Sequence, residues 1–239
     1  MEPPKVLLCD LGQVVVRIQS GRCAEPVAAL FGLDEAVVRL ILWGHMRDCN
    51  RHYARLERDQ IDWRTYFRYC TLLLMRHSGR PVPSDWSLAY FEEQWDKVIG
   101  EPIPEVMEIL ERLAPHVTIA SASNTNQRHY DRMLGSEILR FIKEHTPSHL
   151  LRCRKGDEHY YRILLRHLGV GAHEAVYIDD VPLFTGQAKR EGIRSITLFN
   201  HTPDDFAQLR QDLIDHGVPP EWLPPAPPPM SLQEQLAMP

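Results

Sequence analysis

Three polar groups in this sequence each follow directly after a run of apolar residues. The first is Asp10, the second is Ser123 with Asn124, and the third is Asp179 with Asp180. Each group alone would suit a turn or a helix cap, because loops between strands and helices favour Asp, Ser and Asn. Their joint occurrence in this order is harder to explain by capping. At the carboxyl edge of a parallel sheet, such groups would converge where ligands bind.

Converging carboxylates favour phosphoryl transfer assisted by a metal ion. Carboxylates close together repel one another, and their pKa values rise unless a cation neutralises them. Mg²⁺ fits such a site because it prefers oxygen ligands and needs only a few carboxylates besides water and substrate phosphate. A carboxylate beside that ion can attack phosphorus and form an acyl phosphate. The Ser123 hydroxyl, nearby amides and a lysine could hold the transferred oxygens.

Lys155 is the lysine best placed for this chemistry. The sequence has only five lysines, and Lys155 lies between the second and third polar groups, just ahead of a predicted helix. The alternative is a solvated basic turn, because Arg152 and Arg154 carry the same charge on either side of Cys153.

The order of predicted elements indicates how these groups are positioned. Short apolar runs predict buried strands, and apolar residues at three- and four-residue spacing predict helices. Strands that alternate with helices imply an α/β fold with a parallel sheet and right-handed crossovers. The predicted strands are 5–10, 117–120, 175–178 and 195–199, and the helices between and after them are 103–113, 125–133, 157–167, 184–191 and 203–215.

A helical insertion of about 80 residues is predicted to interrupt this fold after the first strand. Its expected helices are 25–31, 34–43 and 63–75, and Ser84 with Asp85 is expected to cap a further helix. The apolar residues Trp63, Tyr66, Phe67, Leu73 and Leu74 are expected to form the core of the insertion. The proline-rich segment 218–239 is expected to be extended or disordered, although it could also dock a proline-reading partner.

Composition excludes several classes of protein. The 239 residues carry 27 basic and 32 acidic side chains, a net charge of −5, which argues against a nucleic-acid partner. The sequence contains no uninterrupted run of 18 apolar residues, so no membrane span is predicted. The first residues lack the pattern of a signal peptide, and a cytoplasmic location is therefore expected. The five cysteines are scattered, which predicts reduced thiols without a zinc site.

Four ordered motifs resemble those of the haloacid dehalogenase (HAD) superfamily. They are residues 6–16 (VLLCDLGQVVV), 119–126 (IASASNTN), Lys155 and 176–180 (VYIDD). The first two are most similar to a branch of small sugar-phosphate phosphatases. The resemblance implies a Rossmann-like parallel sheet core over 1–18 and 101–217 and an inserted helical cap over 19–100.

The same resemblance implies a Mg²⁺-dependent mechanism through an aspartyl phosphate. Asp10 would be the nucleophile and a metal ligand, and the Gly12 carbonyl would be a second ligand. Asp180, with Asp179, would complete the metal site. Ser123, the amide of Asn124, and Lys155 would hold the phosphate.

The motifs depart from the family pattern at three places. Many phosphatases of the superfamily carry a second Asp where this chain has Gly12, and that Asp serves as the general acid. Gly156 replaces a frequent Pro, and no acidic residue follows Asp180 closely. If leaving-group protonation is needed, His45 or His52 of the cap could supply it. Basic residues of the cap, Arg47 and Arg51 among them, could reach the site, or could simply form a solvated helix surface.

The predicted function is a phosphatase acting on a small phosphorylated metabolite, with the oligomeric state left open. A catalytically impaired binding or regulatory protein is the main alternative, which Gly12 favours. A 2-haloacid dehalogenase also lacks the second Asp, but the Asp179–Asp180 pair would then leave unneutralised charge beside the nucleophile. A phosphonate hydrolase would need a cap lysine. The only lysine of the insertion is Lys97, and its place at the end of a predicted helix near the return to the core counts against this function.

Overall fold

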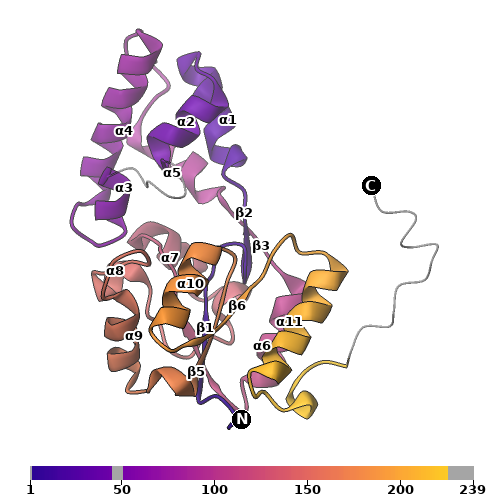
Figure 1. Ribbon diagram of the computed structural model, residues 1–239. Coiled ribbons are helices and arrows are strands. Elements are labelled where there is room, and N and C mark those ends of the chain that lie inside the picture. The colour runs from indigo at the N-terminus through magenta and orange to yellow at the C-terminus, as the bar shows by residue number, and fades with distance from the viewer. Residues whose placement is uncertain (1, 45–50, 226–239) are drawn as a thin grey trace, which may run out of the picture.

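Four parallel strands form the central sheet of the computed structural model, which describes residues 2–44 and 51–225 (Figure 1). Their order across the sheet is β4 (Thr118–Ser121), β1 (Val6–Cys9), β5 (Ala175–Asp179) and β6 (Arg194–Thr197). Val6 pairs with both Thr118 and Ala175, so β4, β1 and β5 begin level and end at the same edge. The α/β fold class with a parallel core sheet is therefore confirmed.

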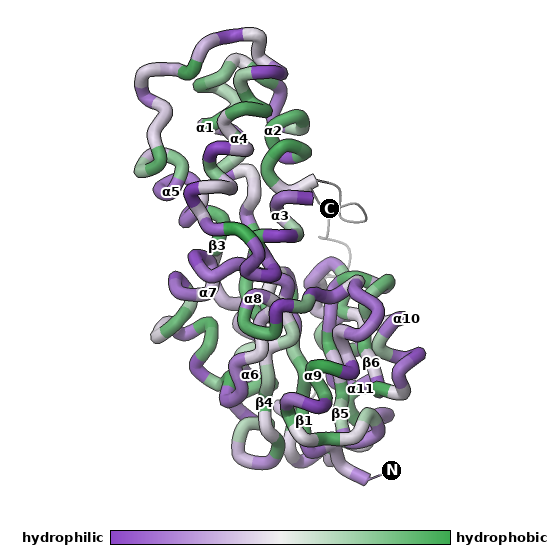
Figure 2. Tube along the Cα trace, turned by 90° about the vertical axis from the view of Figure 1, so that its left-hand side faces the viewer, coloured by the Kyte–Doolittle hydropathy of each residue, from purple (hydrophilic) through white to green (hydrophobic). Residues whose placement is uncertain are grey.

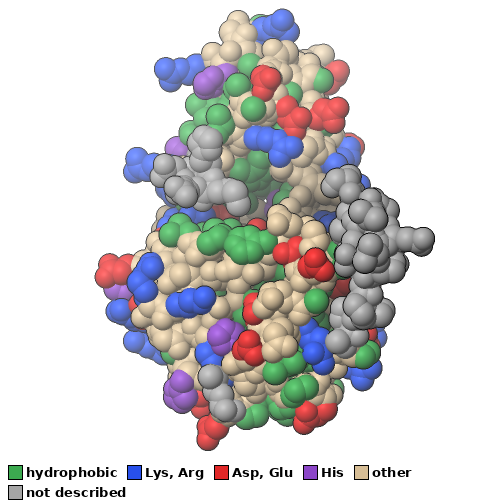
Figure 3. All heavy atoms as spheres, turned by 45° about the vertical axis from the view of Figure 1, so that its right-hand side comes forward, with side chains coloured by type: hydrophobic (Ala, Val, Ile, Leu, Met, Phe, Trp, Pro, Cys, Tyr) green, Lys and Arg blue, Asp and Glu red, His purple; other side chains and the backbone are tan. Residues whose placement is uncertain are grey.

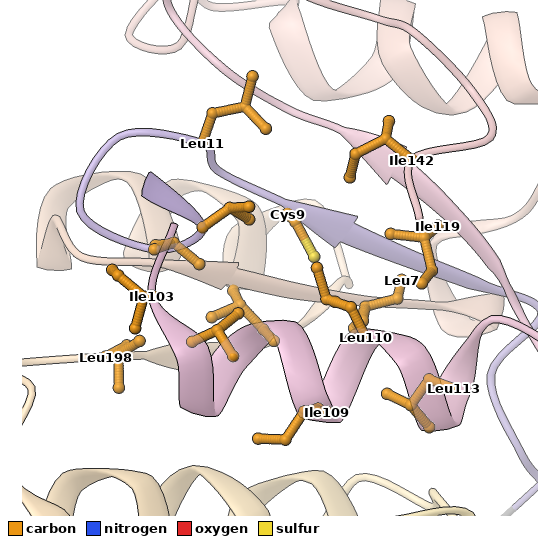
Figure 4. Packing of buried hydrophobic residues seen from close by; sticks show 14 of the residues in the cluster. Leu7, Cys9, Leu11, Ile103, Ile109, Leu110, Leu113, Ile119, Ile142 and Leu198 are labelled. Carbon is orange, nitrogen blue, oxygen red and sulfur yellow. The ribbon is translucent and has the colours of Figure 1, made fainter. Parts of the chain in front are cut away.

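Helices cover both faces of this sheet because its strands are buried on both sides. Along β1, Leu7 and Cys9 pack toward one face, while Val6 and Leu8 pack toward the other. The first face is covered by α6 (Pro104–Leu113) and α11 (Pro203–Asp215), and the second by α9 (Tyr160–Leu168) and α10 (Pro182–Arg190). Figure 4 shows the apolar side of α6 against β1 and β4. Shorter elements are α7 (Gln127–Met133), α8 (Ser148–Leu151), η1 (Glu137–Leu139), η2 (Ala172–Glu174) and η3 (Pro220–Trp222).

The insertion builds a second apolar cluster of its own, above the sheet in Figure 1. Its helices are α1 (Gly21–Phe31), α2 (Glu35–Leu42), α3 (Arg51–Leu56), α4 (Trp63–Ser78) and α5 (Leu88–Asp96). The hydrophobic stretches of these helices lie next to one another in Figure 2. The expected core role of Trp63, Tyr66, Phe67, Leu73 and Leu74 is confirmed, because all five pack in this cluster. The boundaries 1–18, 19–100 and 101–217 stay a prediction.

Three local features differ from the predictions. The insertion is joined to the sheet by a small antiparallel sheet of β2 (Val16–Ile18) and β3 (Ile99–Pro102), whose strands are too short to give a periodic signal. Helix α3 was also not predicted. Ser84 with Asp85 does not cap α5, so that prediction is wrong: residues 83–86 form a turn, and the Ser87 hydroxyl accepts a hydrogen bond from the Tyr90 amide at 3.1 Å.

The first residues after α11 pack against the sheet. Val218 is 2% exposed and Leu223 is 5% exposed, and both belong to the apolar cluster of β1. The expectation of a loose tail from position 218 therefore does not hold for these residues, because their apolar side chains complete that cluster. Residues 226–239 lie outside the described residues. No helix within 2–44 and 51–225 has both the length and the apolar character that a membrane crossing requires.

Candidate active site

Three carboxylates meet at the carboxyl edge of the sheet. Asp10 follows β1, and its amide donates to the Ile178 carbonyl at 2.9 Å, which continues the pairing of β1 with β5. Asp179 ends β5, and Asp180 is the next residue. One carboxylate oxygen from each of these three aspartates lies within 4.8 Å of the others. Parallel, level strands thus bring together residues that are about 170 positions apart.

Lys155 contacts two of these carboxylates from a fully enclosed position. Its Nζ lies 2.9 Å from Oδ2 of Asp10 and 2.6 Å from Oδ2 of Asp179, and the residue is only 2% exposed. Burial alone would lower the pKa of Lys155, but the two carboxylates outweigh burial and raise it above its usual value. Lys155 is therefore a charged ammonium, and the alternative of a solvated basic turn is wrong for this residue.

Asp179 is held by more hydrogen bonds than Asp10. Its Oδ1 accepts from the Val181 amide at 2.7 Å, and its Oδ2 accepts from Lys155 and from the Tyr177 hydroxyl. Tyr177 was not singled out from the sequence. Its position two residues before Asp179 on the same strand was the available signal, because side chains two residues apart share one face. Asp179 therefore orients Lys155 as well as contributing charge.

The charges in this cluster do not balance. Burial raises the pKa of Asp10 to about 7, the charges of Asp179 and Asp180 add to this effect, and Lys155 opposes it. Burial and the neighbouring Asp179 raise the pKa of Asp180 to about 6. One lysine faces three carboxylates, so the fully ionised cluster would carry a charge of −2. A divalent cation with a preference for oxygen ligands fits this donor set, and Mg²⁺ is such an ion.

The loop after β4 links the second motif to the third. Asn124 binds the backbone of Lys155 twice: its Oδ1 accepts from the Lys155 amide at 2.7 Å, and its Nδ2 donates to the Lys155 carbonyl at 3.2 Å. Ser123 is 4% exposed and lines a cavity together with Asn124, Asp10 and Lys155. The side chain of Asn124 thus fixes the backbone of Lys155. Ser123 and the backbone amide of Asn124 stay candidates for phosphate contacts.

This cavity of about 230 Å³ lies between the sheet edge and the insertion. Gly12 lines it, whereas Asp180 lies in a neighbouring depression beside Gln13 and the loop 198–201. Figure 3 shows hydrophobic side chains along the boundary between the two parts of the molecule. The remaining walls are mostly apolar. They come from the loops after β1 and β4, from β2, from β3 and its preceding residue, from α7, from α10 and from the insertion. The residues are Leu11, Val16, Ile18, Ser20, Trp43, Tyr53, Val98, Ile99, Thr125, His129, Met133 and Phe184.

The histidines at the site differ from those expected. His52 does not line the cavity: its ring stacks on Tyr69 with a centroid distance of 3.5 Å. His45 and Arg47 lie outside the described residues. His129, which was not predicted, lines the cavity from the first turn of α7. Its position on the helix that directly follows the Ser123–Asn124 loop was the signal that could have identified it.

Ion pairs join the insertion to the turn that carries Lys155. Arg58 makes two contacts with Asp157, one of them a 2.8 Å bond from Nε to Oδ2. Arg154 Nε lies 2.8 Å from Oε2 of Glu57, whose side chain is 3% exposed. A weaker, exposed pair forms between Arg152 and Asp59 at 3.5 Å. Residues 57–59 of the insertion thus hold residues 152–157 of the core in place.

Solved structures of HAD family proteins have the same architecture as this chain. The HAD family enzyme BT-2542 from Bacteroides thetaiotaomicron has a TM-score of 0.66 and 18% identity, over 82% of this chain and 94% of that one. A predicted HAD-like family hydrolase from Porphyromonas gingivalis gives 0.66 and 19%, over 87% and 98%. This chain has the HAD fold.

More distant HAD-fold structures include dehalogenases. The L-2-haloacid dehalogenase of Xanthobacter autotrophicus has a TM-score of 0.59 and 14% identity, over 92% of this chain and 86% of that one. BT-2542 has also been solved in complex with magnesium and inorganic phosphate. No protein-family model matches the sequence, and no curated protein is similar enough to count as a relative. The predicted HAD architecture is confirmed, and the sugar-phosphate branch is not specified by these structures.

Proposed function

We propose that this protein is a Mg²⁺-dependent phosphatase that hydrolyses a small phosphorylated metabolite through an aspartyl phosphate on Asp10. The observation that carries the proposal is the cluster of Asp10, Asp179 and Asp180 within 4.8 Å, which the buried ammonium of Lys155 neutralises only in part. Such a cluster suits the binding of a divalent cation together with a phosphorylated substrate. The complex of the HAD-fold enzyme BT-2542 with magnesium and phosphate supports the same reading.

In the first half-reaction, the Asp10 carboxylate attacks phosphorus. A bond forms between a carboxylate oxygen and phosphorus, the ester bond breaks, and the leaving oxygen takes the electron pair and then a proton from solvent water. Lys155 and the Ser123 hydroxyl would hold the phosphoryl oxygens, and the amide of Asn124 would add a donor. In the second half-reaction, water attacks the same phosphorus, the bond to Asp10 breaks, and inorganic phosphate leaves.

The candidate metal ligands are the carboxylates of Asp10, Asp180 and Asp179 and the Gly12 carbonyl. Mg²⁺ bound there would neutralise the carboxylates and the phosphate oxygens, so that an anionic nucleophile can approach an anionic substrate. Asp180 is the best candidate beside Asp10, since Asp179 already accepts hydrogen bonds from Lys155, Tyr177 and Val181.

One specific feature favours a rival enzyme. Gly12 removes the usual acid, and HAD-fold dehalogenases are among the similar structures, one with chloropropionic acid covalently bound. A dehalogenase attacks carbon and needs no metal. The carboxylates of Asp179 and Asp180 beside Asp10 count against it, because their charge raises the pKa of the nucleophile. The alternative to both enzymes is a binding protein that has this fold and no catalytic activity.

Turnover and its metal dependence separate these functions. Release of inorganic phosphate from an aryl phosphate is measured with Mg²⁺ and after chelation, and chloride release from 2-chloropropionate is measured in the same two conditions. The proposal expects phosphate release only with Mg²⁺. Chloride release that persists in chelator would establish a dehalogenase, and no turnover of either kind would favour the binding protein.

The nucleophile is tested by Asp10→Asn, which keeps the size of the side chain. The rate should fall by at least ~10³-fold while the fold stays intact, because the attacking oxygen is lost. Asp85→Asn is the matched control, since Asp85 is an exposed residue of the insertion. Beryllofluoride, which mimics a phosphoryl group, should give a bound fluorine resonance with the parent protein and none with Asp10→Asn. A variant that retains most of the phosphatase activity would contradict the mechanism.

A further inference from the structure

The wall of the cavity away from the carboxylates is apolar. Trp43 and Tyr53 come from the insertion, Ile18 and Ile99 from the small antiparallel sheet, and Met133 from α7. Each of these five side chains offers carbon surface, and two of them are aromatic. The insertion and its connecting strands therefore supply a hydrophobic surface opposite the polar groups that follow β1 and β4.

Charge is confined to one side of this cavity. Among the described residues that line it, Asp10 and Lys155 are the only ones with a charged side chain. Both are already committed to the phosphoryl group in the proposed function. A charged group buried without a partner is unfavourable by several kcal/mol. A leaving group with its own carboxylate, ammonium or second phosphate would therefore meet no counter-charge from the described wall.

His129 adds one directional polar group to the apolar wall. Its Nε2 lies 3.1 Å from the Trp95 carbonyl, and its ring stacks on Trp95 at 5.1 Å between centroids. A carbonyl can only accept a hydrogen bond, so Nε2 carries the proton and Nδ1 of the neutral ring is an acceptor. Burial lowers the pKa of His129 to about 4, which keeps the ring neutral near pH 7. His129 is thus able to accept a hydrogen bond from a hydroxyl.

We propose that the cavity takes the leaving group of the phosphate monoester as an uncharged, mostly apolar alcohol, and that His129 accepts a hydrogen bond from a second hydroxyl on it. This inference rests on the proposed phosphatase function and names its substrate class. The cavity volume of about 230 Å³ is below the about 300–1,000 Å³ of sites for drug-sized ligands. A single ring with few substituents is the expected size.

A set of phenyl esters tests the charge argument. The ratio kcat/KM is compared for phenyl phosphate, 3-hydroxyphenyl phosphate and 4-carboxyphenyl phosphate, whose leaving groups are all phenols. The carboxylated ester should be at least ~100-fold poorer, because its carboxylate is desolvated without a partner. Equal kcat/KM for the charged and uncharged esters would overturn the inference while leaving the phosphatase function intact.

The role of His129 is tested by His129→Phe and His129→Gln. Loss of one hydrogen bond should raise KM for 3-hydroxyphenyl phosphate by about 5- to 10-fold with little change in kcat, and the rise in KM for phenyl phosphate should be clearly smaller. The exposed His167 of α9 gives the matched control, His167→Phe. Two replacements are used so that one of them remains informative if the other does not fold. Unchanged KM for the hydroxylated ester in a folded variant would overturn the role of His129.

Binding of the free alcohols separates this inference from the proposed function. Phenol, resorcinol and 4-hydroxybenzoate are titrated into the protein with tryptophan fluorescence as the signal, because Trp43 lines the cavity. Phenol and resorcinol should bind, and Trp43→Phe should remove most of the signal change. If no monoester is hydrolysed yet the alcohols bind and the benzoate does not, the phosphatase function fails and the cavity assignment stands. Preferential binding of the benzoate would overturn the cavity assignment itself.

Discussion

Acidification should destabilise this protein through His129. The side chain is 5% exposed, and burial lowers its pKa from 6.5 to about 4, although the Trp95 carbonyl and Asp96 act in the opposite direction. Between these two pH values the unfolded chain binds a proton at His129 that the folded chain does not. The contribution of His129 to the free energy of unfolding is therefore fully present above pH 6.5 and is lost as the pH drops toward 4.

The magnitude follows from the difference between the two pKa values. At 1.36 kcal/mol per pKa unit, the fall from 6.5 to about 4 corresponds to about 3 kcal/mol. This is a large share of the 5–15 kcal/mol that typically separates folded from unfolded domains. Urea unfolding curves at pH 7, 6, 5 and 4.5 measure the free energy of unfolding at each pH.

The variant His129→Gln isolates this contribution from all other titrating groups. Glutamine keeps an N–H donor for the Trp95 carbonyl but cannot take up a proton. We expect the parent protein to lose up to about 1.4 kcal/mol more per pH unit than the variant below pH 6.5. Parallel curves for the two proteins between pH 7 and 4.5 would refute the reasoning, because His129 would then titrate equally in the folded and unfolded chains.

Three further outcomes are expected. Asp180→Ala should weaken Mg²⁺ affinity and turnover together, as measured by calorimetry and phosphate release, and a variant that lowers turnover alone would count against a metal ligand. Gly12→Asp should raise the rates of hydrolysis of esters with poor leaving groups by up to ~10²–10⁴-fold. The new Cβ would lie 3.0 Å from Ile18 Cγ1, so Gly12→Ala is the steric control. A folded Gly12→Asp variant with the same rates as the parent protein would show that acid catalysis does not limit turnover. Arg154→Gln should lower the free energy of unfolding by about 3 kcal/mol because the buried Glu57 loses its partner, and the double variant with Glu57→Gln should lose less than the sum of the two single losses.

The parallel sheet and the residues at its edge could be predicted because each depends on local sequence. The strands β1, β4 and β5 coincide with short, mostly apolar runs of the sequence, and Asp10, Asn124 and Asp179 stand at the ends of these runs or within a few residues after them. Residues at the ends of level parallel strands must converge, whatever the rest of the chain does. The same argument gives the order of the elements, and it places most of their boundaries within a residue or two.

The parts that could not be predicted depend on contacts between distant segments. The pairing of Val16 with Pro102 joins two strands of three and four residues, and neither carries a recognisable period alone. Helix α3 has only one buried side chain, Leu56, and so offers no apolar stripe. His129 acquires its role only from Trp95, which is 34 positions away and packs against it from α5. The burial of Lys155 could not be predicted either, and its 2% exposure excludes the solvated turn that the local sequence also allowed.

The ion pairs between residues 57–59 and 152–157 limit which insertions could replace the natural one in this protein. A core expressed without its insertion would lose the ion pairs of Arg154 with Glu57 and of Asp157 with Arg58, in the turn that carries Lys155. A foreign insertion grafted at the same junctions would do the same unless it brought an acidic residue and an arginine to matching positions. Residues 57–59 and 152–157 must therefore be kept or exchanged together, although nearly a hundred positions separate the two segments. An exchange of the insertion must therefore keep an acidic partner for Arg154 and a basic partner for Asp157.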